Sequence, residues 1–221
     1  HGSVVSGIIG ALRNNSIGIS GIAGGDVANS ISGVSLIDLK VANAAGVIVP
    51  ATTVSSTDLD NAVVQGATSI GSGGFGINIG NHSYNLGISM PIVYEDAMRY
   101  SFRNGVSFVA SSNNGPNATY SFPACAKDDW VIQVGSNNTN GLWSSSFSNY
   151  NNRVDLVAPG EHDLYMGIAN YNNTSYTNYG NDATSFSAPH VAGVGSLLAS
   201  HINGNTVNST NLATEDFEQL M

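Results

Sequence analysis

Blocks of apolar and polar residues along the chain predict helices interleaved with strands. The helical blocks are either small and apolar or amphipathic with polar first turns, and the strand blocks are short runs rich in Val, Ile and Phe. The predicted helices are His1–Leu12, Thr57–Gln65, Pro91–Asn104 and Val191–Ile202. The predicted strands are Val34–Val41, Val106–Ala110 and Trp130–Gly135. With 221 residues, the chain is long enough for one α/β domain over residues 1–221 with a sizeable core.

Ser185 stands where a polar loop gives way to the last long helix. A helix N-terminus presents unpaired backbone N–H groups and the positive end of the helix dipole, which together can stabilise an oxyanion. Ser and Thr are also common helix caps. The local residues therefore leave two interpretations for Thr184 and Ser185, a cap or a nucleophile.

Three segments resemble motifs of the subtilisin-like serine proteases, the subtilases of peptidase family S8. Thr-Ser-Phe-Ser-Ala-Pro-His-Val-Ala-Gly at 184–193 resembles the nucleophile segment, with Ala183 where the family has Gly. His-Gly-Ser-Val at 1–4 resembles the helix that begins with the catalytic histidine, and Ser-Ser-Asn-Asn-Gly-Pro at 111–116 resembles the segment whose Asn donates to the oxyanion. The resemblance implies that Ser185 is the nucleophile, His1 the general base and Asn113 an oxyanion donor.

The resemblance runs from His1 to about His201. It implies a three-layer α/β/α sandwich with a mainly parallel sheet, in which His1, Asn113 and Ser185 meet at the carboxyl end of the strands. The implied function is that of a serine endopeptidase acting on protein or peptide substrates. A catalytically inactive subtilase-like domain, serving in binding or as a structural module, is the alternative.

The family's catalytic triad runs Asp, His, Ser, and its Asp lies on a central strand before the His. We therefore expect residues 1–221 to be a fragment, truncated at the N-terminus, whose upstream segment supplies the Asp. The residues of Thr214–Met221 predict the start of a last helix that the chain leaves unfinished. Without the Asp, the chain by itself should be nearly inactive.

Two further residues are candidates for other roles. Asp38 lies in a predicted strand that is not the family's Asp-bearing one, so we predict an exposed strand residue. Gly76–His82 stands in the place of the family's Val-Ile-Asn-x-Ser-Leu-Gly, which helps to form the substrate-pocket wall. Gly80, Asn81 and His82 depart from that motif, which leaves the substrate preference open, and we predict that His82 is a surface loop residue.

No cofactor is required for the implied reaction. Two segments of the sequence are nevertheless candidates for binding a metal ion. In some subtilases the loop that corresponds to Arg13–Ala23 binds calcium, here through Asn15, Ile17 and Ile19. Calcium takes six to eight oxygen ligands, often carboxylates, and this loop has none. A structural calcium site is thus unsupported, and a solvated connection is the alternative. An N-terminal His-Gly can also chelate copper, a third hypothesis.

Composition narrows the class of partner. Six Lys and Arg against 15 Asp and Glu, a net charge of −9, argue against a nucleic-acid partner. No apolar run reaches the ~18 residues of a membrane span. Few charges and many Asn, Ser and Gly suit a secreted, extracellular protein. Cys125, the single cysteine, can form no intrachain disulfide and is predicted to be buried.

Overall fold

The computed structural model describes residues 1–16, 18–41, 56–126, 130–161, 165–166, 177–178, 181–202, 217 and 219–221. The helices are α1 (Gly2–Gly10), α2 (Ser56–Ala67), the short 3-10 helix η1 (Ile70–Ser72), α3 (Ile92–Arg103) and α4 (Thr184–Ile202). The strands are β1 (Ile79–His82), β2 (Ser107–Ser111), β3 (Val131–Asn137), β4 (Leu156–Pro159), β5 (Tyr165–Met166) and β6 (Thr177–Asn178).

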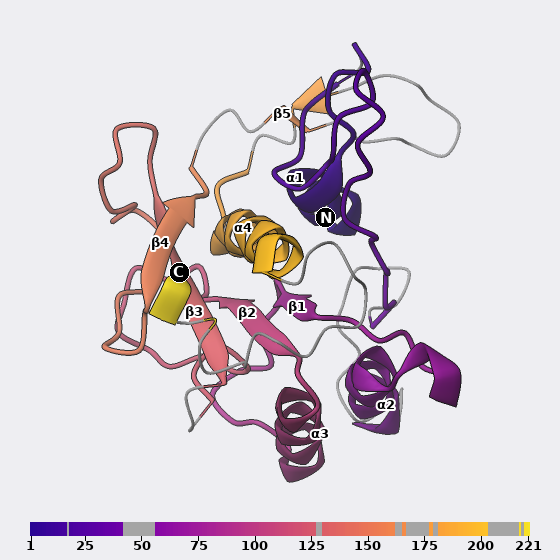
Figure 1. Ribbon diagram of the computed structural model, residues 1–221. Coiled ribbons are helices and arrows are strands. Elements are labelled where there is room, and N and C mark those ends of the chain that lie inside the picture. The colour runs from indigo at the N-terminus through magenta and orange to yellow at the C-terminus, as the bar shows by residue number, and fades with distance from the viewer. Residues whose placement is uncertain are drawn as a thin grey trace.

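A four-stranded sheet in the order β1-β2-β3-β4 lies at the centre, and every neighbouring pair is parallel (Figure 1). Figure 1 shows α4 on one face of this sheet and α2 and α3 on the other. Because helices cover both faces, β2 is buried along its whole length instead of alternating between core and solvent. The three-layer α/β/α sandwich expected from the sequence is confirmed.

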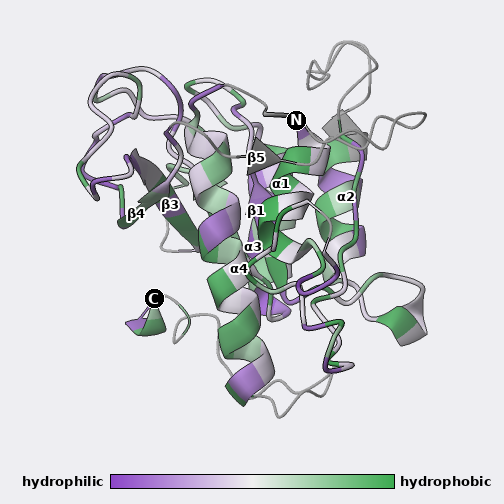
Figure 2. Ribbon diagram, turned by 90° about the horizontal axis from the view of Figure 1, so that it is seen from above, coloured by the Kyte–Doolittle hydropathy of each residue, from purple (hydrophilic) through white to green (hydrophobic). Residues whose placement is uncertain are grey.

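The two faces of the sheet have separate cores. Phe108 and Ala110 of β2 pack with α2 and α3, whereas Val109, between them, packs with Ala188 and Val191 of α4. This division follows from the strand geometry, since successive side chains point to opposite faces. A third cluster joins α1 to the start of α4, which lie side by side (Figure 2).

Most predicted elements form close to their expected places, but Val34–Val41 does not form a strand. Residues 33–41 pair with no strand in the described part of the chain. Strand propensity alone cannot hold an extended segment, because its backbone groups need a hydrogen-bonding partner. Asp38 is exposed, as expected.

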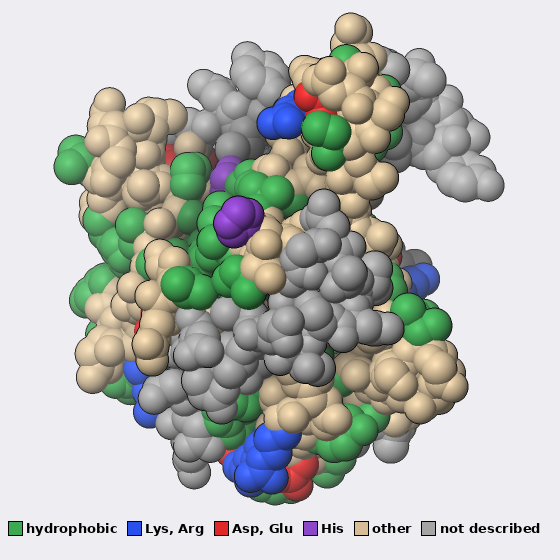
Figure 3. Space-filling view, viewed as in Figure 1, with side chains coloured by type: hydrophobic (Ala, Val, Ile, Leu, Met, Phe, Trp, Pro, Cys, Tyr) green, Lys and Arg blue, Asp and Glu red, His purple; other side chains and the backbone are tan. Residues whose placement is uncertain are grey.

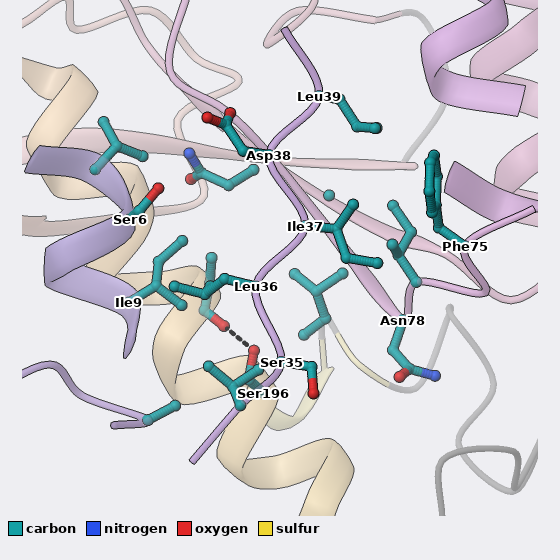
Figure 4. A pocket seen from close by; sticks show the side chains of 18 of the residues that line it. Ser6, Ile9, Ser35, Leu36, Ile37, Asp38, Leu39, Phe75, Asn78 and Ser196 are labelled. Carbon is teal, nitrogen blue, oxygen red and sulfur yellow. Dashed lines mark hydrogen bonds between the residues drawn. The ribbon is translucent and has the colours of Figure 1, made fainter. Parts of the chain in front are cut away.

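A groove of about 1920 Å³ separates this segment from the sheet. Its walls are formed by residues 31–41, by α1, by the later turns of α4 and by residues 75–85 around β1. Figure 4 shows Leu36, Ile37 and Leu39 of the segment between Ile9 of α1 and Phe75. Among the described residues, β1 pairs only with β2, so its other edge faces this groove.

Two more predictions can be compared with these elements. Cys125 is buried, as predicted, and burial raises the pKa of its thiol. Of Thr214–Met221, only Phe217 and residues 219–221 are described; 217, 219 and 220 are helical, and Phe217 packs into the core on the α4 side.

Candidate active site

Ser185 lies in the first turn of α4. The N–H of Thr184 and its hydroxyl both donate to Oδ1 of Asn114, at 2.8 and 2.9 Å. Asn114, 70 residues away, therefore satisfies the helix start, and neither Thr184 nor Ser185 is the cap. The N–H of Ser185 has no acceptor among the described residues, so it can donate to a bound anion.

Pro189 decides how the other backbone group of Ser185 is satisfied. A proline four residues on has no N–H to donate, so the Ser185 carbonyl lacks its helical partner. The hydroxyl of Ser83, just after β1, donates to that carbonyl at 2.7 Å. In return the hydroxyl of Ser185 donates to the Ser83 carbonyl at 3.3 Å. Asn81 Nδ2 donates to the Ser83 hydroxyl at 2.9 Å and holds it in place.

His1 lies at the N-cap of α1, and its side chain is exposed. Its ring centroid is 5.7 Å from that of Phe186, the residue after Ser185. Val4 and Ile8 of α1 pack in one cluster with Phe186. The structure therefore brings His1 beside the start of α4, but no hydrogen bond among the described residues joins its imidazole to Ser185.

Asn113 follows the carboxyl end of β2 in a left-handed conformation, with φ 86°. Asn adopts this conformation more readily than most residues. Its Oδ1 accepts from the N–H of Asn114 at 2.8 Å, which leaves the side-chain NH₂ without an acceptor among the described residues. The buried Asn149 fixes the loop, because it donates its N–H to the Asn113 carbonyl and accepts from the N–H of Gly115.

The three predicted site residues thus lie on three segments that converge at the carboxyl end of the sheet. Asn113 and Ser185 are linked through Asn114 and Thr184, and His1 is linked through Phe186. Their catalytic roles stay predictions.

The prediction for His82 is wrong. It lies in β1 with 6% of its surface exposed, because the even-numbered positions of β1 face the core. Its Nδ1 is 2.6 Å from the hydroxyl of Tyr84 and 3.0 Å from that of Tyr94. Burial lowers the pKa of His82 to about 4, so its imidazole is neutral at pH 7.

Sequence reasoning also missed Ser83 and Asn114. The signal for Ser83 was present, since Asn81-His82-Ser83 also matches the Asn-x-Ser of the family motif, three residues after the match at 78–80. No local signal distinguished Asn114 from the many other Asn residues, because its role depends on a segment 70 residues away.

Another buried or partly buried histidine, His190, lies in α4. Nδ1 of His190 is 2.7 Å from the carbonyl oxygen of Phe186, which fits donation by the ring N–H. Burial lowers the pKa of His190, and the hydrogen bond partly opposes this. His190 is therefore a structural contact of the helix.

The described residues contain no group of three or more His, Cys, Asp or Glu side chains placed to hold a metal ion. Of the predicted calcium ligands, Ile17 lies outside the described residues. None of the described helices is long and apolar enough to cross a membrane.

The model of the subtilase family matches residues 1–220. The chain belongs to the subtilase family. This subtilase is 29% identical over 216 residues to thermitase of Thermoactinomyces vulgaris, covering 98% of this chain and 66% of thermitase. It is 29% identical over 209 residues to an extracellular protease of Xanthomonas campestris pv. campestris, covering 90% of this chain and 32% of that protein.

Solved structures agree on the fold. A cold adapted subtilisin-like serine proteinase superposes with a TM-score of 0.69 at 24% identity, over 100% of this chain and 66% of that one. This subtilase therefore spans between 32% and 66% of the length of these relatives.

Proposed function

We propose that this subtilase is a secreted serine endopeptidase. Ser185 is the nucleophile, His1 the general base, and the Asn113 side chain and the Ser185 N–H are the oxyanion donors. One observation carries the proposal: Ser185 lies in the first turn of α4 beside segments that contribute His1 and Asn113, and its N–H has no acceptor among the described residues. Its relatives that are named proteases support a protein or peptide substrate.

In the proposed reaction, His1 removes the proton from the Ser185 hydroxyl as its oxygen attacks the peptide carbonyl. The developing oxyanion accepts hydrogen bonds from the Ser185 N–H and the Asn113 NH₂. His1 then returns the proton to the leaving amine, and the acyl-enzyme is hydrolysed by water in the same way. For this to occur, the Ser185 hydroxyl must turn from the Ser83 carbonyl towards His1.

His1 needs a carboxylate to fix its tautomer and stabilise its protonated form. We propose that an extended segment from outside residues 1–221 supplies an Asp and occupies the groove beside β1. Two features support this partner. The groove is flanked by α1, whose N-cap is His1. Among the described residues, the edge of β1 that faces the groove pairs with no other strand. Without that Asp, activity should be lower by about 10⁴-fold.

Secretion is supported by composition. Only 10% of residues are charged, and Figure 3 shows few charged side chains on the face it presents. Detection of the native protein in the culture medium, against a cell-retained marker enzyme, would test this part of the proposal.

The test uses the extended chain, meaning residues 1–221 preceded by the sequence encoded directly upstream of His1. We expect it to hydrolyse peptides and to be labelled by a fluorophosphonate at Ser185, located by mass spectrometry of the labelled peptide. Ser185→Ala should lose both. Ser187→Ala is the matched control, because Ser187 lies two residues on in the same helix and its buried hydroxyl has no hydrogen-bond partner within the described ranges. Peptide hydrolysis by Ser185→Ala at the parent rate would refute the proposal.

One observation favours the alternative of a non-catalytic binding domain. The Ser185 hydroxyl donates to the Ser83 carbonyl and not to His1. If this arrangement persists in the extended chain, that chain should fold and bind peptides. It should neither hydrolyse them nor react with the fluorophosphonate. Isothermal titration with a peptide mixture, alongside the labelling assay, separates the two functions.

A further inference from the structure

Beneath β1, on the side of the sheet opposite α4, three polar groups contact one another. His82 Nδ1, the Tyr84 hydroxyl and the Tyr94 hydroxyl form a triangle with sides of 2.6, 2.6 and 3.0 Å. We name these three residues the His–Tyr cluster. The ring of Phe108 packs edge-on against that of His82 at 5.1 Å and closes the cluster on the sheet side.

The cluster fixes the chain on both sides of Ser83. His82 and Tyr84 flank Ser83 in sequence and contact Tyr94 of α3, whereas Ser83 itself contacts Ser185 of α4. This is the alternation of an extended chain, in which residues i and i+2 point to one face and i+1 to the other. The segment thus connects α3 on one face of the sheet to the start of α4 on the other.

The protons of the cluster can be assigned consistently. All three groups are neutral at pH 7, because burial lowers the pKa of His82 to about 4 and raises the pKa values of both tyrosines. With Nδ1 unprotonated, the Tyr84 hydroxyl donates to it and the Tyr94 hydroxyl donates to the Tyr84 oxygen. Each hydroxyl proton then has an acceptor, and His82 carries its proton on Nε2.

The chain beyond Ser83 is also fixed. The N–H of Leu86 donates to the Phe122 carbonyl at 2.7 Å, and the N–H of Phe122 donates to the Gly87 carbonyl at 3.0 Å. On the other side, His82 pairs with Ala110 in the sheet. Ser83 is therefore held from both directions, and the side chains of the His–Tyr cluster fix the residues directly before and after it.

We propose that the His–Tyr cluster positions Ser83, and through Ser83 the hydroxyl of Ser185. This inference rests on the proposed function, because it concerns the nucleophile of that reaction. The members of the cluster are positioning residues and touch no substrate atom. Loss of one hydroxyl should let the Ser83 carbonyl and hydroxyl shift, so that the Ser185 hydroxyl takes up the attacking orientation less often.

A buried carboxylate acts electrostatically on this cluster. Asp60 of α2 is 6% exposed, and neither of its side-chain oxygens has a hydrogen-bond partner in the part of the chain that the structure describes. Its charge contributes to the raised pKa of Tyr94, after burial and the contact with Tyr84. The negative charge favours keeping the Tyr94 proton in place, and with it the donation to Tyr84.

The first experiment measures labelling of Ser185 in the extended chain with a small fluorophosphonate, separated into kinact and KI. Tyr94→Phe should lower kinact about tenfold, with KI changed less than about twofold, as expected for one lost hydrogen bond that acts only on orientation. Tyr100→Phe is the matched control, because Tyr100 lies on the same helix with 47% of its surface exposed. Tyr84→Phe serves as a second variant should Tyr94→Phe fail to fold by near-UV circular dichroism.

Rescue at His82 separates positioning from simple packing. The amide oxygen of Asn occupies nearly the place of Nδ1, whereas that of Gln lies nearer the place of Nε2. His82→Asn should therefore keep kinact within about threefold, and His82→Gln should lower it about tenfold. Equal losses in the two variants, or unchanged kinact in Tyr94→Phe and Tyr84→Phe, would overturn the inference.

A second readout does not depend on catalysis. In a chain labelled with ¹³C-serine, the Cβ signal of Ser185 is assigned by its absence in Ser185→Ala. Tyr94→Phe should shift or broaden this signal and Tyr100→Phe should not. If the parent protein is not labelled by the fluorophosphonate, the proposed function fails while this measurement still decides the inference: an unmoved Ser185 signal overturns it.

Discussion

Ser83 and Ser185 stand 102 residues apart and hydrogen-bond each other in both directions. These two bonds join the end of β1 to the first turn of α4. The Ser185 carbonyl is open to the Ser83 hydroxyl because Pro189 leaves it without a helical donor. The candidate nucleophile is thus held by a neighbouring strand as well as by its own helix.

The first prediction concerns the oxyanion donor. Asn113→Ala should lower kcat for peptide hydrolysis by the extended chain about 10²–10³-fold, with little change in KM, because the side-chain NH₂ acts on charge that develops only in the transition state. Asn140→Ala, an exposed asparagine in a turn, is the control. An unchanged kcat for Asn113→Ala would exclude the assigned role.

The second prediction concerns the start of α4. Asn114→Ala removes the acceptor for both the N–H and the hydroxyl of Thr184, so the free energy of unfolding should fall by about 1–2 kcal/mol. Urea unfolding of the extended chain measures this, again with Asn140→Ala as the control. A loss no larger than that of the control would show that the Asn114 contact adds nothing to helix stability.

The third prediction concerns pH and His82. Its pKa in the folded protein is about 4, against 6.5 for an ordinary histidine, so the unfolded chain binds the extra proton between these values. The stability of the fold should therefore fall as the pH drops from 6.5 to 4, by about 3 kcal/mol from this residue. Burial lowers the pKa of His190 too, and its contribution has the same sign.

The measurement is urea unfolding of the extended chain at several pH values. His82→Asn cannot bind the proton in either state, so it should flatten the profile. His201→Asn, an exposed position in the last turn of α4, should leave it steep. Parallel profiles for the parent and His82→Asn would contradict the prediction.

The fourth prediction concerns the groove beside β1. Residues 1–221 by themselves leave one edge of β1 and the apolar walls of the groove uncovered among the described residues. Unpaired buried backbone groups cost about 1–3 kcal/mol each, against a net stability of about 5–15 kcal/mol. We expect this chain to be loosely packed or aggregated, and addition of the upstream segment as a peptide to produce a cooperative transition.

Thermal unfolding followed by near-UV circular dichroism tests this, and a peptide of the same composition in scrambled order is the control. A sharp, reversible transition of residues 1–221 without any peptide would show that the chain closes its own sheet.

The sequence by itself determined the parts of this protein that depend on local order along the chain. The segments around His1, Asn113 and Ser185 are continuous motifs, so they identified the family and the candidate site. The helices Pro91–Asn104 and Val191–Ile202 were also predictable, because periodicity and end signals act over a few residues.

Tertiary structure decided what depends on partners distant in sequence. Val34–Val41 has strand-like residues but no paired neighbour in the described chain, so its propensity is not realised. His82 is buried because β2, α3 and two tyrosines surround it. Likewise, Ser83 and Asn114 acquire roles only when α4 packs against the ends of β1 and β2. The physical reason is that hydrogen bonds and burial are properties of pairs in space, whereas a motif records only neighbours along the chain.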